Sequence, residues 1–397
     1  MQKTLPKGWI TARLDEVCLK ITDGSHRTPK LLDSGYPFLT VVNIKDGRFD
    51  FSNVKYIAKE DYKDLVKNDC KPLKGDILFS KDGTIGKVLE IKEDKDIVVL
   101  SSIAILRPNQ KILNSSYLAL IASSDVLTKQ AIAMQSGSAL RRIILKNLKT
   151  AKIPLPPLPT QHKIVEILEE ADNLRKLRQQ ADEKMKDLIP SLFVQMFGDP
   201  VTNPKGWEVK KLEEVCDIKS GGTPSRNIKE YWGGNIPWLG STVCKDMPVY
   251  TAEEFITITG LEKSAAKIFK HKTTLIALVG ATIGRTAFLT FEAATNQNIA
   301  GLYPLNSNIL IPEFIFYFSQ TLYNEFLKLG EEKFRMANLS FIRGLKILLP
   351  PLSLQQEFAK LVEDIEAEKA RQAESKKKLD ELFQSLMQKA FTGELVA

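Results

Sequence analysis

Apolar residues recur at heptad spacing in two long stretches, 160–198 and 354–397, while Glu, Lys and Arg fill most of the positions between them. This pattern is typical of helices that pair along an apolar seam, as in a coiled coil. Arg178 interrupts the first seam, and a polar run at 366–378 interrupts the second. Since an α-helix rises about 1.5 Å per residue, a helix of roughly 36 residues would be about 54 Å long, so each is expected to act as a spacer. The predicted seam positions are Ile164, Leu168, Leu174, Met185, Leu188, Leu192, Phe358, Leu361, Ile365, Leu379, Leu382 and Leu386.

A proline-rich elbow precedes each of these helices. Residues 153–197, which begin IPLPPLPTQ, return as 347–391, which begin ILLPPLSLQ, at an offset of 194. Because proline pairs disfavour the helix interior, the first helix is predicted to begin just after Leu158 or Pro159, with Thr160 as its N-cap. The chain therefore contains an internal repeat, which any fold must explain.

The stretches in front of the two elbows repeat each other as well. Residues 6–18 (PKGWITARLDEVC) match 204–216 (PKGWEVKKLEEVC) at an offset of 198. Residues 75–91 and 273–289 each place apolar runs on both sides of a Gly turn that ends in a basic residue. Apolar strands joined by a Gly turn predict a hairpin-like element.

Further strands and a closing helix complete each predicted lobe. Each lobe is therefore expected to be α+β and strand-rich, with a terminal helix. The additional strands are predicted at 36–42, 97–108, 235–243 and 293–304, and the closing helices at 116–133 and 312–329.

Connectivity limits how the two long helices can pair. The first helix leads from the first lobe into the second, and the second helix starts where the second lobe ends, so helices that pack on each other must run antiparallel. A solvated bundle element is the ordinary interpretation of one long charged helix, but duplication of a whole lobe favours the paired arrangement. The predicted fold has two tandem α+β lobes related by a pseudo-two-fold axis and spaced by an antiparallel coiled coil, with domains 1–159, 160–198, 199–353 and 354–397.

Composition argues against a membrane, exported or disulfide-stabilised protein. The chain has no run of about eighteen apolar residues and no apolar region of a signal peptide at its start, so a cytoplasmic protein is expected. The four cysteines lie far apart without a CxxC pair, and there are three histidines, so neither zinc nor a disulfide framework is predicted. Cys18 and Cys216 occupy equivalent repeat positions and are expected to be small buried thiols.

The positive charge lies mainly in the lobes. Lys and Arg outnumber Asp and Glu by 26 to 17 in residues 1–159 and by 17 to 15 in 199–353. Acidic residues slightly outnumber basic ones in both helical stretches. A basic lobe favours a polyanionic partner such as nucleic acid, although modest excess charge also serves solubility.

Motifs of the obvious enzyme classes are absent. Each Pro-Pro pair lies between leucines, so the Asn/Asp-Pro-Pro-aromatic motif of amino-methyltransferases is missing, as is a GxGxxG loop. The run GTIGK at 83–87 is not a phosphate loop, because its glycines are too close and Val88 follows in place of Ser or Thr. No catalytic residue and no metal site are predicted.

The order of these motifs resembles the specificity subunit of type I restriction-modification systems. PKGW, GGTPS with YWGGNIPW, GATIGR, ATNQN and LPPL before a long helix carry the resemblance over essentially the whole chain. It implies a non-catalytic targeting subunit with two target recognition domains, each reading one half of a split duplex DNA sequence. In the first lobe DGSHRTP at 23–29 replaces the GGTPS run, so contacts of that loop are harder to transfer.

The resemblance also implies the partners and their cofactors. The repeated helices would form the antiparallel coil, set the spacer between half-sites and bind two modification (methyltransferase) subunits, with restriction subunits joining that complex. S-adenosylmethionine, ATP and magnesium are expected on those partners, with no cofactor on this chain. The alternative is a coiled-coil adaptor whose lobes bind proteins, which the basic lobes argue against.

Base reading selects the candidate DNA-binding residues. Arg or Lys suits guanine, Asn or Gln suits adenine, and further cations suit phosphates. For any one of them a solvated surface role is the simpler interpretation, and for Asn296, Gln297 and Asn298 buried polar bonding serves equally well. The candidates are Ser25, His26, Arg27, Lys30, Lys81, Lys87, Gln135, Arg141 and Arg142 in the first lobe, and Ser225, Arg226, Lys229, Tyr231, Arg285, Lys333, Arg335 and Asn338 in the second.

Overall fold

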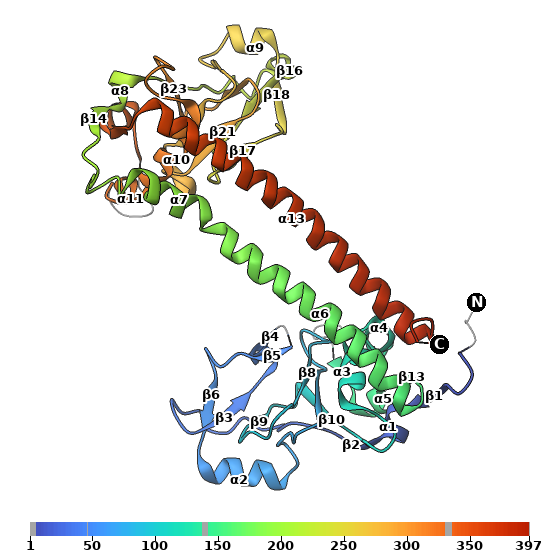
Figure 1. The fold of residues 1–397 in the computed structure, drawn as a ribbon. Coiled ribbons are helices and arrows are strands. Elements are labelled where there is room, and N and C mark those ends of the chain that lie inside the picture. Colours follow the sequence, from blue (N-terminus) through green and yellow to red (C-terminus); the bar gives the residue numbers. More distant parts are fainter. Residues whose placement is uncertain (1–4, 46, 137–141, 330–335, 397) are drawn as a thin grey trace. The chain divides into compact units, whose positions relative to one another are not determined.

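A computed structural model describes the chain at residues 5–45, 47–136, 142–329 and 336–396. The chain divides into two compact units (Figure 1). The first unit is Met1–Gln179 with Glu374–Ala397, and the second is Gln180–Ala373. Each unit therefore contains one lobe, part of the first long helical segment and part of the second.

Two sheets build the lobe of the first unit. The larger has the order β2-β10-β7-β8 with antiparallel neighbours throughout. The smaller has the order β6-β3-β9, in which β3 is antiparallel to β6 and parallel to β9. The strand pairs β1-β13, β4-β5 and β11-β12 are antiparallel. The strands are β1 (Ile10–Arg13), β2 (Cys18–Asp23), β3 (Tyr36–Leu39), β4 (Ile44–Lys45), β5 (Arg48–Phe49), β6 (Lys55–Ile57), β7 (Ile77–Ser80), β8 (Val88–Glu90), β9 (Val98–Val99), β10 (Ile103–Pro108), β11 (Gln135–Ser136), β12 (Arg142–Ile143) and β13 (Lys152–Leu155).

Short helices cover these sheets. The larger sheet shares one apolar core with α3 and with turns of both long helices, including Phe79, Tyr117, Leu168 and Phe391. The helix α2 packs on the smaller sheet through Tyr62 and other buried residues (Figure 1). The helices are α1 (Leu14–Val17), α2 (Lys59–Lys67), α3 (Ser115–Ser123), α4 (Asp125–Ala133) and α5 (Leu145–Lys149), with the 3-10 turn η1 (Val41–Asn43).

The second unit repeats this plan. Its larger sheet, β15-β23-β20-β21-β17, contains the counterparts of β2-β10-β7-β8 in the same order plus one strand. Its other sheet has the order β18-β16-β22-β19, and β14 pairs with β24 as β1 pairs with β13. The strands are β14 (Glu208–Lys211), β15 (Cys216–Ser220), β16 (Trp232–Leu239), β17 (Met247–Val249), β18 (Glu254–Ile256), β19 (Ile268–Phe269), β20 (Thr274–Ala277), β21 (Thr286–Leu289), β22 (Ala293–Thr295), β23 (Ile299–Pro304) and β24 (Lys346–Leu349).

Aromatic residues dominate the core of the second unit. Phe193 and Phe197 contact Phe314 and Phe358, with ring centroids 4.9 to 5.7 Å apart. Aromatic pairs of this kind add to the free energy gained from burying their area. The short helices of this unit are α8 (Leu212–Val215), α9 (Ile258–Glu262), α10 (Pro312–Thr321), α11 (Tyr323–Leu327) and α12 (Leu339–Gly344), with 3-10 turns η2 (Lys229–Tyr231), η3 (Ser241–Val243) and η4 (Gly280–Thr282).

Both predicted hairpins are confirmed, but two other elements differ from expectation. The strands β7 and β8, and β20 and β21, are antiparallel neighbours. The single strand predicted at 97–108 is two strands in different sheets, β9 and β10, because the chain turns where the Ile103 amide donates to the Leu100 carbonyl. The strand predicted at 293–304 is divided in the same way into β22 and β23.

The closing helices occupy the predicted places but are each broken. Ser124 ends α3, and its hydroxyl accepts a hydrogen bond from the amide of Val126 at 3.2 Å, so it caps a new helix, α4. Serine oxygens satisfy the unpaired amides of a helix start in this way. The second closing helix is divided at Leu322 into α10 and α11.

The long helices start earlier than predicted. The first, α6 (Leu158–Lys186), begins with the Pro157 carbonyl accepting the amides of Thr160 and Gln161, so Thr160 lies inside the first turn and its prediction as N-cap is wrong. The second, α13 (Leu352–Thr392), begins the same way from Pro351. A proline can supply the first carbonyl because that role needs no N–H.

The first long helix is also interrupted near its end, while the second is continuous. Asp187 separates α6 from α7 (Leu188–Phe197), and Pro190 lies in the first turn of α7, where its missing N–H costs nothing. The equivalent position in the repeat is Gln384, which has the N–H that proline lacks. The prediction of one uninterrupted first helix was therefore wrong, and Pro190, which is present only in the first copy, was the sequence signal for the break.

The helical segments pack antiparallel within each unit. In the first unit Ile164, near the start of α6, shares a core with Phe391, near the end of α13. Arg175, later in α6, bonds to Asp380, earlier in α13, at 2.7 Å from Nε to Oδ1, and its guanidinium lies 4.5 Å from the ring centroid of Phe383. In the second unit Phe197, at the end of α7, packs on Phe358, near the start of α13.

Candidate nucleic-acid interface

The loop after β2 places three candidates of the first lobe at the surface. The start of this loop passes so close to β9 that residue 24 has to be glycine, because a Cβ there would lie 2.0 Å from the Val99 carbonyl oxygen. Ser25 is itself buried, with its hydroxyl 2.5 Å from the Arg27 carbonyl, so it shapes the loop. His26, Arg27 and Lys30 are exposed.

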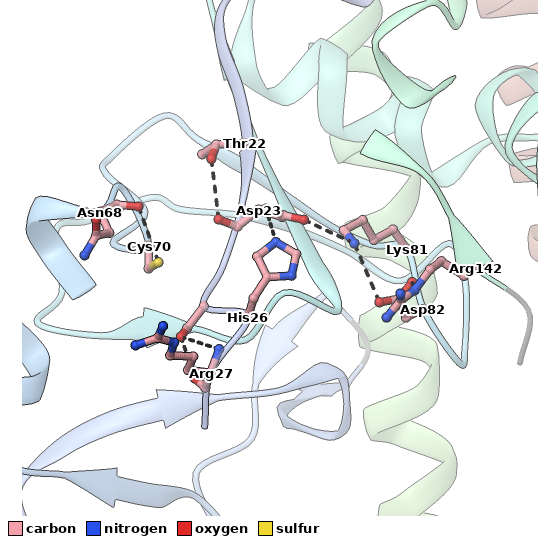
Figure 2. Close-up of polar contacts among 10 residues, drawn as sticks. Thr22, Asp23, His26, Arg27, Asn68, Cys70, Lys81, Asp82 and Arg142 are labelled. Atoms are coloured by element: carbon pink, nitrogen blue, oxygen red, sulfur yellow. Dashed lines mark hydrogen bonds and ion pairs between the residues drawn. The ribbon is translucent and has the colours of Figure 1, made fainter. Parts of the chain in front are cut away.

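Lys81 lies under this loop and not on the surface. Its side chain is 5% exposed, and its Nζ lies 3.2 Å from Asp23 Oδ2 and 3.6 Å from Asp82 Oδ2 (Figure 2). Asp82 also accepts a hydrogen bond from Arg142 Nε at 3.1 Å. A lysine is rarely buried unless it is paired, and here two carboxylates pair with it.

The remaining candidates of the first lobe differ in environment. Lys87 is half-buried and donates from Nζ to the Val41 and Ile44 carbonyls, at 3.2 and 2.8 Å, so it holds the loop around η1. Gln135 is in β11, whose partner strand β12 contains the exposed Arg142. Arg141, Lys333 and Arg335 lie outside the described residues.

In the second lobe Arg226 is clamped by its neighbours. Its two terminal nitrogens donate to the two carboxylate oxygens of Glu254 at 2.5 and 2.9 Å, and its guanidinium carbon lies 3.7 Å from the ring centroid of Trp232. These bonds lower the pKa of Glu254 below its ordinary value and raise that of Arg226. Trp232 packs edge-on against Trp238, so its indole has a packing role in this lobe.

Arg285 and Asn338 also have local partners. Arg285 donates from Nη1 to Asp246 at 2.6 Å, and its guanidinium lies over the Tyr323 ring at 4.4 Å. Asn338 caps α12, because its side-chain oxygen accepts the amide hydrogen of Phe341 at 2.9 Å.

Three further candidates border the Arg226 clamp. The Ser225 carbonyl accepts a hydrogen bond from Trp232 Nε1 at 3.2 Å. Tyr231 is half-buried in η2, and Lys229 beside it is exposed. Ser225 therefore contributes to the loop through its backbone, while Lys229 faces solvent.

Sequence reasoning singled out the cations and missed the acids that hold them. Asp82 and Asp23 hold Arg142 and Lys81, and Glu254 holds Arg226. The adjacency of Lys81 and Asp82 was a local signal, but Arg226 lies in a turn 28 residues before Glu254, so their pairing could not be predicted from the sequence. DNA contact by any candidate stays a prediction.

The predicted helix seam is only partly buried. Ile164, Leu168 and Phe358 are fully buried, while Leu174 and Leu382 are about half exposed, at 49% and 51%. Leu188 and Leu361 are exposed too, and Met185, Leu192, Ile365, Leu379 and Leu386 are intermediate. In α7 the buried positions are Ile189, Phe193 and Phe197, one residue later than predicted, because the break at Asp187 shifts the helical phase.

Cys216 is buried as predicted, whereas Cys18 is intermediate in exposure, so the prediction of a buried thiol holds only for the second copy. Burial raises the pKa of Cys18 and Cys216 to about 12, and no described cysteine forms a disulfide. Across the described ranges no cluster of His, Cys, Asp and Glu is arranged to hold a metal, and no helix is long and apolar enough to cross a membrane.

The two lobes define a duplicated DNA-recognition protein. Residues 6–186 and 204–382 each match the family described as the type I restriction modification DNA specificity domain. The chain belongs to this family, as a specificity subunit of a type I restriction-modification system, which is a non-catalytic targeting subunit.

Individual relatives agree over nearly the whole length. The type I restriction enzyme HindI specificity subunit of Haemophilus influenzae is 22% identical over 445 residues, covering 91% of this chain and 95% of that protein. A chain solved in work on the complex assembly and conformational transition of the type I R-M system has a TM-score of 0.68 at 22% identity, covering 99% of this chain and all of that one. The HsdS subunit from Thermoanaerobacter tengcongensis has a TM-score of 0.53 at 20% identity, covering 99% of both chains.

Proposed function

We propose that each lobe reads one half of an asymmetric, bipartite duplex site. The observation that carries this is the duplication of one backbone plan with different side chains at equivalent positions. Lys81 and Leu278 are equivalent positions. Lys81 follows β7 and Leu278 follows β20, and the amide of each donates to the carbonyl just before the neighbouring strand, that of Ser102 or Asn298. Lobes of one plan suit equivalent grooves of a duplex, and different side chains suit different bases.

The long helices set the distance between the two half-sites in this proposal. Half-sites one turn of B-DNA apart are separated by roughly 34 Å, which helices of this length can span. The bases between the half-sites would then be an unread spacer, whose length depends on the helices.

The exposed apolar positions of the helices are the proposed docking surface for two modification subunits. Leu174 and Leu177 on α6, and Leu361 and Leu382 on α13, remain exposed within their own units. Exposed apolar side chains mark an interaction surface when they are contiguous, and Leu174 and Leu177, three residues apart, lie on one face of α6. Restriction subunits would join this complex in the cytoplasm, with S-adenosylmethionine, ATP and magnesium bound to the partner subunits.

A binding experiment tests the proposal. The chain is co-expressed with its modification subunit, the methylated genomic sites are determined, and gel shifts compare duplexes that contain both half-sites, one half-site or neither. Selective binding that requires both half-sites is the expected result. A complex that binds all duplexes equally would reject the proposal and favour the adaptor interpretation.

A further inference from the structure

Five ionisable side chains form one continuous chain of contacts in the first lobe (Figure 2). His26 Nε2 lies 3.2 Å from Asp23 Oδ1, and Asp23 Oδ2 lies 3.2 Å from Lys81 Nζ. Lys81 Nζ lies 3.6 Å from Asp82 Oδ2, and Asp82 Oδ1 accepts from Arg142 Nε at 3.1 Å. The central Lys81 is buried, whereas the side chains at the two ends, His26 and Arg142, are 73% and 62% exposed.

The backbone fixes this chain to the larger sheet. The Lys81 amide donates to the Ser102 carbonyl at 2.9 Å, and the Lys81 carbonyl accepts the Ile143 amide hydrogen at 2.9 Å. Asp82 and Arg142 face each other in an antiparallel bridge. The charged groups are therefore attached to strand ends and not to a free loop.

The second lobe builds the same backbone without the charges. The Leu278 amide donates to the Asn298 carbonyl and its carbonyl accepts the Ala337 amide, both at 2.8 Å, while Val279 bridges Met336. Strand register thus makes Leu278 the counterpart of Lys81, and Val279 that of Asp82. By the same register Ser220 corresponds to Asp23, and Met336 to Arg142.

The fold of the lobe does not require a charged residue at the position of Lys81. An apolar residue fills the position of Lys81 in the second lobe and is just as buried there. Replacing a buried ion pair by packed apolar groups is often neutral or stabilising, so folding alone gives no reason for Lys81 and its two carboxylates. Among these groups Asp82 contacts the exposed Arg142 directly, and Lys81 contacts Asp82 from the buried side.

The orientation of Arg142 differs from that of the other clamped arginines. Arg142 bonds to Asp82 through Nε, and no bond from its terminal nitrogens to another described residue is present. Both terminal nitrogens of Arg226 instead donate to Glu254, and one terminal nitrogen of Arg285 donates to Asp246. A terminal fork without a partner among the described residues matches the O6 and N7 acceptors of guanine in the major groove.

We infer that Arg142 is a specificity-determining residue that reads a guanine in the half-site of the first lobe, and that Asp23, Lys81 and Asp82 are its positioning residues. The inference rests on the proposed function and adds the residue and the base. Asp82 preorganises the fork, Lys81 keeps Asp82 in place, and Asp23 neutralises Lys81 from the other side. Preorganisation reduces the entropy that Arg142 would lose on binding DNA.

The test uses the complex of the full chain with its modification subunit. Binding is measured to the selected duplex and to a panel in which each base pair of the first half-site is replaced in turn. Arg142→Lys keeps the charge and removes the fork, so discrimination should fall by about ten- to a hundredfold at one G·C pair, with the second half-site read as before. Arg13→Lys is the matched control, because Arg13 also pairs with a carboxylate, Asp15, in the same unit, and it should change no base preference.

The triple variant Asp23→Ser, Lys81→Leu, Asp82→Val tests the positioning residues. It introduces the residues that the second lobe already accommodates, so it should fold, and thermal unfolding checks this. It should lose about tenfold in discrimination at the same G·C pair, because Arg142 is no longer oriented.

Three results would overturn the inference. The first is that Arg142→Lys leaves the base preferences of the complex unchanged. The second is that Arg142→Lys weakens binding equally to every duplex of the panel, which marks a phosphate contact. The third is that the folded triple variant keeps full discrimination at the G·C pair. The proposed function fails separately, if the wild-type complex itself binds without sequence selectivity.

Discussion

The Gln161 side chain makes the same three hydrogen bonds in the first unit as Gln355 makes in the second. Gln161 accepts the Asn114 amide at 2.8 Å and donates to the Ile112 and Pro156 carbonyls, both at 2.8 Å. Gln355 accepts the Ile311 amide at 3.1 Å and donates to the carbonyls of Ile309 and Pro350, at 2.9 and 2.8 Å. Both side chains are fully buried, so each glutamine joins a long helix to its lobe at the elbow.

Replacing either glutamine by methionine should destabilise its unit. The change keeps the volume but leaves a buried amide and two carbonyls unpaired, and each such group costs about 1 to 3 kcal/mol. The free energy of unfolding, measured by denaturant titration, should therefore fall by at least about 2 kcal/mol. Gln179→Met on the exposed side of α6 is the control and should stay within about 0.5 kcal/mol. Equal effects at Gln161 and Gln179 would contradict this role.

The Arg226–Glu254 pair should make stability depend on pH. Because Arg226 lowers the pKa of Glu254 in the folded chain, the pair contributes stability above the unfolded pKa of about 4.3 and loses it as pH falls through the folded value. Both side chains are about half exposed, so solvent screening limits the contribution to about 1 kcal/mol at most.

The measurement compares wild type with Glu254→Gln by urea unfolding from pH 7 down to pH 3. The difference in unfolding free energy should be largest near pH 7 and vanish at the acid end. Glu253→Gln, at the exposed neighbouring residue, should show no such pH-dependent difference. A constant difference across the range would mean that the pair acts through packing on Trp232 and not through charge.

A charge on the exposed helix surface should weaken docking of the modification subunit without unfolding the chain. Leu177 is 60% exposed, so Leu177→Glu should alter the unfolding free energy by less than about 0.5 kcal/mol. Its effect on partner affinity, measured by calorimetry, should be about tenfold or more, because a charge would be buried in an apolar interface. Gln179→Glu adds the same charge nearby as the control. Equal affinities of wild type and Leu177→Glu would place the docking surface elsewhere.

Lengthening the first helix should change the spacer of the methylated site. Four residues inserted after Gln179 add about 6 Å, or about two base pairs of B-DNA at 3.4 Å each. Methylation sequencing of a strain that expresses this variant with its modification subunit should show a longer tolerated spacer and unchanged half-sites. A double substitution, Gln179→Ala with Gln180→Ala, keeps the length and should keep the spacer. An unchanged spacer in the insertion variant would show that the length of the first helix does not set the distance between the half-sites.

Local patterns were sufficient for elements whose causes lie within a few residues. The hairpins β7-β8 and β20-β21 follow from apolar runs around a Gly turn, and the helices α6 and α13 follow from heptads behind a proline elbow. The break at Asp187 was also within reach, because Pro190 has no counterpart in the second copy. The charged candidates were harder, because exposure depends on what the rest of the chain places above each side chain.

The sequence by itself determined the duplication, the α+β lobes, the two long helices and the family, since these depend on periodicity and on repeated motifs. Only the tertiary structure decided that Lys81 is buried between Asp23 and Asp82, that Glu254 binds both terminal nitrogens of Arg226, and that Arg142 binds Asp82 through Nε. Each of these pairings joins residues far apart in the chain, apart from Lys81 with Asp82. Strand pairing and the packing of loops bring them together, and the residues that neighbour each side chain in the sequence do not show which distant segment will lie beside it.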